Sequence, residues 1–263
     1  MGTIEWNVNM VALQLGSFGI RWYSLLFLAS FFAGYQYMKH RLAEKGFGLE
    51  VLDSLLMHSM ISTILGARLG HCLFYEPNVY LNDPIRILKV WEGGLASHGA
   101  LIGILIGLYL FTRKFKINYL WLLDRYVIPV ALAGCFIRLG NLMNSEIIGK
   151  PTGSDWGFVF KQVDDIPRHP TQIYESMSYL ISFLLLHTLF KTTSLKEKPG
   201  FFSGLFFVLI FSFRFGIEFL KEHQVAFESS LPLDMGQLLS IPVVLIGVFL
   251  MVFKGFNSPK LSY

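Results

Sequence analysis

The chain has 263 residues, of which 53% are hydrophobic and only 15% are charged, and its mean hydropathy is +0.52. Soluble domains are usually about 45–50% apolar and about 25% charged, so this composition excludes an ordinary soluble protein and indicates an integral membrane protein. The net charge of +4 does not indicate a nucleic-acid partner, because the basic residues are spread among short loops. The sequence shows no Pro-, Gly- or Ser-rich linker and no repeat, so we expect a single membrane-embedded domain over residues 1–263.

Seven apolar runs are long enough to cross a bilayer, which takes about 20 mostly apolar residues. They predict an all-α, polytopic membrane protein with transmembrane helices at approximately 18–38, 53–75, 94–112, 119–141, 172–190, 201–220 and 235–253. Segment 1–17 is expected to be an exposed amphipathic stretch before the first helix.

The distribution of Lys and Arg predicts the orientation, because cytoplasmic loops are enriched in both residues. Eleven Lys and Arg but only three acidic residues lie in one alternating set of segments, 39–50, 113–118, 191–200 and the tail after 253. Six Lys and Arg and eleven acidic residues lie in the other set, 1–17, 76–93, 142–171 and 221–234. We therefore expect the N-terminus outside, the C-terminus in the cytoplasm and a small extramembrane region outside, at 142–171.

The first two predicted helices each carry an arginine among aromatic or small residues. Gly19-Ile-Arg21-Trp22-Tyr23 leads into the first helix, and because Trp and Tyr are common at membrane interfaces, Tyr23 alone indicates an anchor. The second helix ends in Gly66-Ala-Arg68-Leu-Gly70, whose small residues let helices pack closely. We expect Arg68 to pair with a carboxylate, either as a structural ion pair or at a substrate contact.

A histidine marks the start of the third predicted helix, in Gly93-Gly94-Leu-Ala-Ser97-His98-Gly99. An imidazole titrates near physiological pH, as a general base should, and the neighbouring glycines leave backbone room for a bulky substrate. A lone histidine in an apolar run is more often a hydrogen-bonded core residue, and we place His58, His71 and His187 in that class. His98 is the candidate base because of its glycine setting and the residues that follow.

The fourth predicted helix ends in a group of polar residues where hydrocarbon would be expected: Arg138, Asn141, Asn144 and Glu146. A charge inside a membrane span costs roughly 2.5–3.5 kcal/mol on insertion scales, so by default it marks function. Arg138, Asn141 and Asn144 are spaced i, i+3 and i+6, close to one helical face. A helix end that meets lipid headgroups would explain Asn144 and Glu146, but Arg138 comes earlier, inside the apolar run. We therefore predict a polar site at membrane depth.

Every basic residue inside the predicted helices is an arginine: Arg21, Arg68, Arg125, Arg138 and Arg214. Arginine stays charged at low dielectric, and its planar fork matches phosphate or carboxylate. Interfacial snorkelling explains Arg21 and Arg125 near span ends, whereas for Arg138 and Arg214 we favour phosphate binding. Arg214 and Glu218 are spaced i, i+4, within ion-pair reach, so they form either a structural pair or a latch that opens for an anionic headgroup.

Taken in order, these motifs resemble the prolipoprotein diacylglyceryl transferase family. The matching stretches are Gly19–Tyr23, Gly66–Gly70, Ser97-His98-Gly99, Arg138-x-Gly140-Asn141-x-x-Asn144-x-Glu146-x-x-Gly149, Pro167–Glu175, Arg214-x-x-x-Glu218-Phe and Met235-Gly236-Gln237. They extend over almost the whole chain, so the resemblance is specific. The family commonly has glycine where this chain has Ile137, Ser145 and Ser24, which affects the local backbone more than the functional positions.

The resemblance implies transfer of the diacylglyceryl group of phosphatidylglycerol to the lipobox cysteine thiol of a preprolipoprotein, with formation of a thioether and release of glycerol 1-phosphate. It implies His98 as the base that takes the thiol proton, and Arg138 and Arg214 as the donors that stabilise the departing phosphate. The other implied residues are Tyr23, Asn141, Glu146 and Gly149 for binding phosphatidylglycerol, and Arg68 and Glu218 for a structural or gating role.

The resemblance also implies that no metal or organic cofactor is needed, because the lipid is itself the activated donor. The expected partners are phosphatidylglycerol, the preprolipoprotein signal peptide and the bilayer, with the active site toward the periplasmic leaflet of a bacterial cytoplasmic (inner) membrane. A transporter or flippase for an anionic lipid or metabolite is the competing class, because intramembrane arginines also fit that function. A structural membrane subunit is the third.

Overall fold

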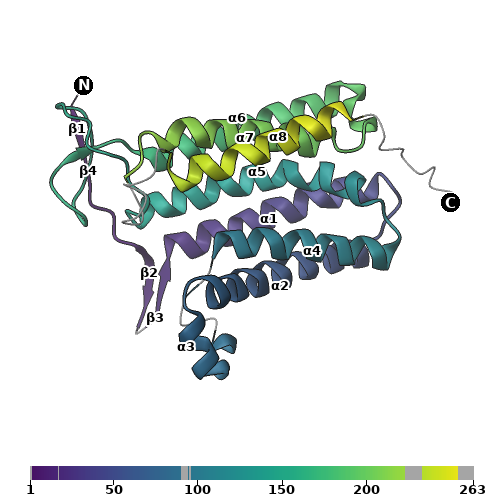
Figure 1. Ribbon diagram of the computed structural model, residues 1–263, viewed down its shortest axis with the longest axis horizontal. Helices are drawn as coiled ribbons and strands as arrows, with labels where there is room; N and C mark the ends of the chain where they lie inside the picture. The colour runs from purple at the N-terminus through teal and green to yellow at the C-terminus, as the bar shows by residue number, and fades with distance from the viewer. Residues whose placement is uncertain (1, 17, 90–93, 95, 223–232, 254–263) are drawn as a thin grey trace. The chain divides into compact units, whose positions relative to one another are not determined.

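The computed structural model of the protein describes residues 2–16, 18–89, 94, 96–222 and 233–253. The chain forms two compact units, and each is described by itself: the first comprises Met1–Tyr37 and Asp124–Tyr263, and the second comprises Met38–Leu123. Both are mostly helical, as Figure 1 shows. The expectation of a single domain over 1–263 stays a prediction.

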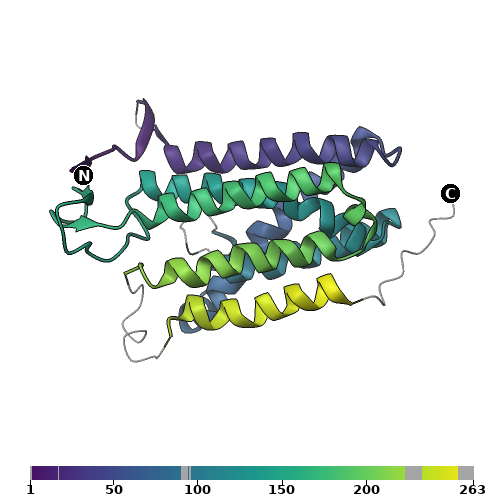
Figure 2. The ribbon, with the colours of Figure 1, turned by 90° about the horizontal axis from the view of Figure 1, so that it is seen from above.

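The first unit contains the helices that carry most of the polar residues singled out above. Its helices are the first part of α1 (Trp22–Ala43), α5 (Tyr119–Met143) from Asp124 onward, α6 (Thr171–Thr192), α7 (Phe201–Glu218) and α8 (Met235–Val252), with a short 3-10 helix η3 (Ser194–Glu197) before α7. Figures 1 and 2 show α6, α7 and α8 running side by side.

A buried carboxylate fixes the start of α7 in this unit. Asp124 on α5 accepts hydrogen bonds from Gly200 N (2.7 Å) and Ser203 N (2.8 Å), two backbone donors that have no partner within the helix. Asp124, the one acidic residue inside the fourth predicted helix, therefore caps a neighbouring helix.

The second unit is built on a close pair of helices, α2 (Leu49–Phe74) and α4 (Ser97–Phe115), joined through the short α3 (Pro77–Asn82) and η1 (Pro84–Leu88). A Cβ atom added to Gly66 would lie 2.7 Å from the Gly103 Cα atom, and one added to Gly70 would lie 2.7 Å from the Gly99 Cα atom. The prediction that small residues let helices approach closely is thus confirmed.

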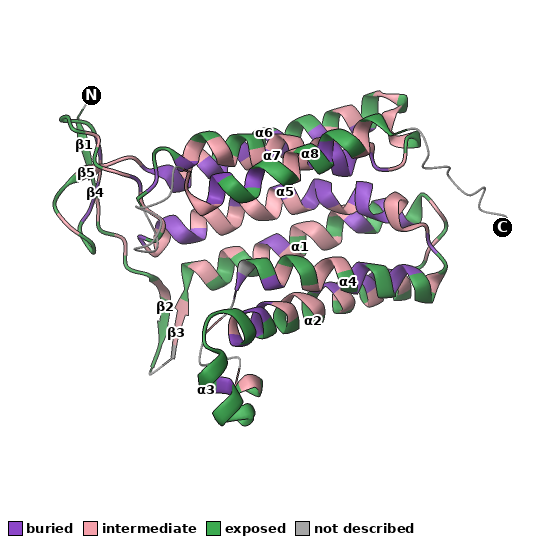
Figure 3. Cartoon of the chain, viewed as in Figure 1, coloured by how far each residue is buried: buried purple, intermediate pink, exposed green. Residues whose placement is uncertain are grey.

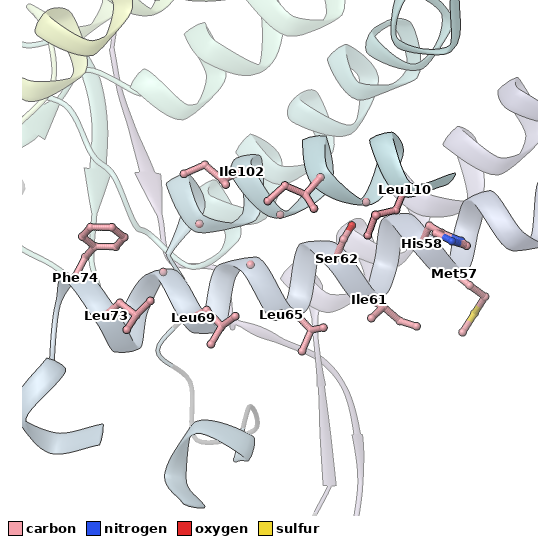
Figure 4. A pocket seen from close by; sticks show the side chains of 16 residues that line it. Met57, His58, Ile61, Ser62, Leu65, Leu69, Leu73, Phe74, Ile102 and Leu110 are labelled. Atoms are coloured by element: carbon pink, nitrogen blue, oxygen red, sulfur yellow. The ribbon is translucent and has the colours of Figure 1, made fainter. Parts of the chain in front are cut away.

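An apolar groove of about 590 Å³ runs along the α2–α4 pair, with glycines at its floor. Figure 4 shows its walls, which include Leu65, Leu69 and Leu73 on α2 and Ile102 and Leu110 on α4.

The long helices agree with the predicted spans. Each of the seven predicted runs overlaps a helix of 18 residues or more. Five of these helices, α2, α5, α6, α7 and α8, are long and apolar enough to cross a membrane by length and composition, so the count of seven spans stays a prediction. Figure 3 shows exposed residues along α2, α4 and α8, and on α8 these include Leu245, Ile246 and Phe249. Exposed hydrocarbon along an apolar helix is what lipid contact requires, so the helices support a polytopic membrane protein.

The expectation of an all-α chain is corrected by five short strands in the first unit. β1 (Thr3–Trp6) pairs in parallel with β4 (Gly157–Phe160), and β4 pairs antiparallel with β5 (Pro167–Arg168). β2 (Val11–Leu15) and β3 (Phe18–Arg21) form a hairpin, so α1 begins at Trp22 and Arg21 lies in a strand.

The N-terminal stretch is therefore part of the fold. The Trp6 Nε1 atom donates a hydrogen bond to Leu142 O (3.0 Å) at the end of α5. Pairing of Thr3 with Gly157, more than 150 residues away, leaves no local pattern that the sequence could have revealed.

Candidate functional site

Arg138 lies near the end of α5, and its guanidinium is turned toward α6. Its Nε atom is 3.0 Å from the Glu175 Oε2 atom, and its side chain is only 13% exposed. Its Nη1 atom donates to Asn141 Oδ1 (3.3 Å), one helical turn further on. Tyr179 and Glu218 also lie within electrostatic reach of the guanidinium. An arginine so buried keeps its charge through these anionic and polar neighbours.

Asn141 connects Arg138 to Glu146. The Asn141 Nδ2 atom donates to Glu146 Oε2 (3.2 Å), while Asn144 Nδ2 donates to Glu146 Oε1 (3.0 Å). Both carboxylate oxygens are thus held by amides at the end of α5, from Asn141 in its last turn and Asn144 directly after it. The structure brings Arg138, Asn141, Asn144 and Glu146 together as one hydrogen-bonded chain.

Tyr23 joins this group from α1. A Cβ atom added to Gly140 on α5 would lie 2.7 Å from the Tyr23 Cδ2 atom, so the absence of a side chain at Gly140 lets the ring pack on the helix. From there the phenol is close enough to Glu146 and Arg138 to interact with both charges. Gly140 is a residue that the sequence analysis quoted in the motif without giving it a role.

The turn that carries Glu146 has an unusual backbone. Ser145 (φ 53°) and Ile147 (φ 55°) are both left-handed, a conformation that is rare for residues other than glycine and a clear outlier for a β-branched one. Two buried side chains at the start of α6 hold the turn: Gln172 Nε2 donates to Glu146 O (2.6 Å) and Thr171 Oγ1 donates to Ile147 O (2.9 Å). The left-handed φ explains why glycine suits position 145, where this chain has serine.

Gly149 lies where three backbone segments meet. Its N–H donates to His169 O (3.0 Å), and the residue forms a β-bridge with Lys221. A Cβ atom here would lie 2.6 Å from the His169 Cβ atom and 2.9 Å from Leu220 O. The close approach of these segments accounts for the glycine, and its predicted role in phosphatidylglycerol binding stays a prediction.

The predicted pairing of Arg214 with Glu218 is wrong. Although both residues are described, no ion pair joins them; Glu218 Oε2 instead contacts the Lys221 Nζ atom at 3.1 Å. Lys221, 2% exposed, also lies 2.9 Å from Glu175 Oε1. Glu218 packs on α8, since a Cβ atom added to Gly236 would lie 2.6 Å from Glu218 Oε1. The Glu218 carboxylate turns away from Arg214 because it contacts the buried Lys221 ammonium and fits against Gly236, which has no side chain.

Arg214 itself is half-buried on α7 and makes no hydrogen bond or ion pair with another described residue. Nearby, Gln237 Nε2 on α8 donates to Phe215 O on α7 (3.3 Å). That bond links α7 and α8.

Outside the helices of the first unit, Arg168 ties the small sheet to the segment after α7. Its Nε and Nη2 atoms donate to both oxygens of Asp164, the shortest contact being 2.7 Å, and its Nη1 atom donates to Glu222 Oε2 (2.9 Å) and Gly149 O (3.2 Å). The hydrogen bonds from Arg168 hold the pKa of the Asp164 carboxyl below its usual range.

The second unit contains the other two predicted site residues. His98 is the second residue of α4 and its side chain is exposed. Arg68 is buried on α2, where Nε donates to Ile87 O (3.0 Å), Nη1 donates to Gly94 O (3.4 Å) and the guanidinium lies 5.0 Å above the Tyr80 ring. These contacts hold the α2–α4 connection and agree with a structural role.

Trp91–Gly93 and Leu95, which precede His98 in the motif, lie outside the described residues. Because His98 and Arg138 belong to different units, their predicted meeting stays a prediction. In the part of the chain that the structure describes, no three or more His, Cys, Asp or Glu side chains are grouped as metal ligands.

Neither Lys221 nor Glu175 was predicted as a site residue from the sequence, where Glu175 was named only as the end of the Pro167–Glu175 motif. Lys221 was counted as a loop charge because it follows the apolar run of α7. Its spacing of i+3 from Glu218 was the feature that could have revealed it.

Comparisons with known proteins show the family of this chain. The family model described as prolipoprotein diacylglyceryl transferase matches residues 10–253. A protein of Tolumonas auensis is 51% identical over 256 residues, covering 97% of this chain and 99% of its own, and one of Bacteroides fragilis is 44% identical over 265 residues, covering 96% of each. A protein of Chloroherpeton thalassium is 42% identical over 260 residues, covering 98% of this chain and 97% of its own. All three are named phosphatidylglycerol–prolipoprotein diacylglyceryl transferase. The chain belongs to the prolipoprotein diacylglyceryl transferase family.

Proposed function

We propose that the protein transfers the diacylglyceryl group of phosphatidylglycerol to the lipobox cysteine of preprolipoproteins, in a bacterial cytoplasmic membrane with the active site toward the periplasmic leaflet. The names of its relatives support the two substrates. The observation that carries the proposal is the largely buried Arg138, whose Nε atom contacts Glu175, while its Nη1 atom donates a long hydrogen bond to Asn141 and Tyr179 lies within hydrogen-bond reach of the guanidinium. A guanidinium fixed at one edge keeps donors for a phosphate at the other.

The reaction is a displacement at carbon. The lipobox thiol gives its proton to His98, and the thiolate attacks the glyceryl CH₂ carbon that carries the phosphate ester. A C–S bond forms, the C–O bond to the phosphate oxygen breaks, and the bonding electron pair leaves with glycerol 1-phosphate. An exposed imidazole on the first turn of α4 is accessible to a peptide thiol.

Stabilising the leaving phosphate is the task of the arginines. Arg138 is our first choice, because Asn141 and Glu175 fix its orientation before the lipid arrives. Arg214 is the second, since it makes no ion pair with another described residue and its charge is available to an anion. Glu146 and Tyr23 orient the headgroup from the end of α5, where the two Asn side chains hold Glu146 in place.

The competing functions have weaker support. A transporter or flippase for an anionic lipid or metabolite is not supported, because the matching family and the three relatives are described as transferases. A structural subunit would leave the hydrogen-bonded chain from Arg138 to Glu146 without a chemical role.

Purified protein incubated with phosphatidylglycerol and a lipobox peptide tests the function. We expect mass spectrometry of the peptide to show the mass of one diacylglyceryl group on its cysteine, with glycerol 1-phosphate in equal amount. No adduct, under conditions in which one of the relatives is active, would refute the proposal.

Two variants test the assigned roles. Removal of a general base slows reactions about 10²–10⁴-fold, so His98→Gln should lower kcat by at least about 100-fold. His58→Gln is the control: the His58 Nδ1 atom contacts Ser54 O within its own helix, and this variant should keep the wild-type kcat. Loss of one preorganised donor costs about 10²–10³-fold in kcat, and we expect a loss of this size for Arg138→Lys. Arg125→Lys is the control, because the Arg125 guanidinium lies over the Phe190 ring, and its kcat should not fall in this way. A His98→Gln variant with wild-type activity would refute the role of His98 as the general base.

A further inference from the structure

The Glu175 carboxylate is divided between two cations. Its Oε2 atom is 3.0 Å from Arg138 Nε, and its Oε1 atom is 2.9 Å from Lys221 Nζ. Among the described residues, the Oε2 atom has this ion pair but no hydrogen bond, so its contact with Arg138 is close yet poorly directed. Arg138 therefore lacks the two parallel hydrogen bonds that a carboxylate can give an arginine.

Lys221 is held firmly in this position. Its backbone forms a β-bridge with Gly149, and its N–H donates to Glu218 O (3.1 Å), which turns the chain back after α7. The ammonium is buried between Glu175 and Glu218. The buried group thus contains two cations, Arg138 and Lys221, and two carboxylates.

Removal of the ammonium would change the group in two ways. The Glu175 Oε1 atom would be free to rotate onto Arg138 and close a two-point pair that occupies the guanidinium. One arginine would also face two carboxylates, and the net negative charge would repel an anionic headgroup at the low dielectric of this site. Both changes weaken phosphate binding without touching the thiol substrate.

We propose that Lys221 is a positioning residue for phosphatidylglycerol: by holding Glu175 Oε1 and Glu218, it keeps the Nη atoms of Arg138 available to the headgroup phosphate. This inference rests on the proposed function, since it assigns the phosphate to Arg138. In this proposal Lys221 acts through Glu175 and Glu218 and does not itself touch the substrate.

The test measures kcat and the KM of each substrate for Lys221→Met in detergent-purified protein. We expect the KM for phosphatidylglycerol to rise about tenfold or more and the KM for the lipobox peptide to stay within about twofold. Lys221→Arg, which can still bridge the carboxylates, should restore the lipid KM to within a few fold. Lys150→Met is the matched control, because Lys150 follows Gly149, the bridge partner of Lys221, but its ammonium donates to Phe219 O instead of to a carboxylate. The KM of this variant for phosphatidylglycerol should be that of the wild type.

A second variant keeps the test valid if Lys221→Met does not fold because one buried carboxylate is left without a cation. The double variant Lys221→Met/Glu218→Gln keeps the buried group neutral, yet it frees Glu175 Oε1 to close on Arg138, so its lipid KM should still be raised. A wild-type lipid KM in the double variant, or equal changes in both KM values for Lys221→Met, would overturn the positioning role. Absence of transfer by the wild type would instead refute the function, so the two failures are distinguishable.

Discussion

Ser145 holds a left-handed backbone (φ 53°) in the turn that carries Glu146, and its buried hydroxyl has no hydrogen-bond partner among the described residues. Glycine adopts this φ without steric conflict and removes the unpaired hydroxyl. Left-handed backbone costs an ordinary residue about 1–2 kcal/mol, part of which the extra freedom of glycine in the unfolded chain offsets. We expect Ser145→Gly to raise the free energy of unfolding by about 1 kcal/mol, measured by denaturant titration in detergent.

Ser178→Gly is the control for this prediction. Ser178 lies inside α6 and its hydroxyl donates to Glu175 O (2.8 Å), so glycine there should lower the free energy of unfolding by about 1 kcal/mol. Equal destabilisation by both changes would contradict the strain at position 145.

Asp164 makes the small sheet sensitive to acid. The hydrogen bonds from Arg168 lower the pKa of its carboxyl, so the folded pKa lies below that of the unfolded chain. The Arg168–Asp164 pair therefore stabilises the folded protein fully at pH values above the pKa of Asp164 in the unfolded chain. This contribution is lost as the pH falls through the pKa of Asp164 in the folded protein. We expect the protection factors for hydrogen exchange in residues 157–168 to fall below about pH 4, and Asp164→Asn to show low protection factors already at neutral pH.

Asp165→Asn provides the comparison for the acid effect. The Asp165 side chain is 84% exposed, and among the described residues its one ion pair is with Lys161, 2.8 Å away. This variant should keep high protection factors at neutral pH and lose them in acid as the wild type does. If instead Asp165→Asn abolished the acid response and Asp164→Asn did not, the Arg168–Asp164 pair would not be its source.

At the scale of elements, the contact between α2 and α4 depends on glycines that leave no room for a methyl group. A Cβ atom added to Gly103 would lie 2.8 Å from the Gly66 Cα atom, so the helices must separate to admit Gly103→Ala. Overpacking of this kind typically costs about 1–3 kcal/mol. Gly34→Ala on α1 has nothing within 4 Å and should instead stabilise by up to about 1 kcal/mol. Thermal unfolding of both variants in detergent measures the difference, and a Gly103→Ala variant as stable as the wild type would contradict the close packing.

The elements that the sequence predicted are those whose cause is local. An apolar run of membrane length makes a helix wherever it occurs, so all seven runs coincide with long helices. β1 forms only because β4, far along the chain, offers it an edge, and no pattern within residues 1–17 contains that information. Helix existence was therefore predictable, and strand pairing was not.

The candidate site divides along the same line. Arg138, Asn141, Asn144 and Glu146 lie within nine residues and are joined by hydrogen bonds, and helical spacing had predicted a shared face for the first three. Lys221 and Glu175 come from different elements, and their contact follows from the packing of α7 beside α6. Arg214 and Glu218 had the right spacing but the wrong partner, since a buried ammonium competes for the carboxylate.

At the scale of the whole molecule, α6 determines which side of the membrane the candidate site faces. Its 22 residues extend about 33 Å, enough to cross a hydrocarbon core of about 30 Å. Its first turn lies beside Arg138 and the small sheet, while its last turn leads to η3 and the basic segment 191–200. Because Lys and Arg favour the cytoplasm, we expect the sheet, and with it Arg138, to face the periplasm.

Cysteine labelling in intact cells tests this orientation. Lys161, directly after β4, and Lys198, directly after η3, are exposed and lie in the segments that precede and follow α6. Cys72 and Cys135 are buried, so the natural cysteines should give little background. Lys161→Cys should react with a membrane-impermeant maleimide in intact cells, whereas Lys198→Cys should react only after permeabilisation. The reverse pattern would place Arg138 toward the cytoplasm, where an exported lipobox cysteine could not reach it, and would contradict both the orientation and the proposed periplasmic site.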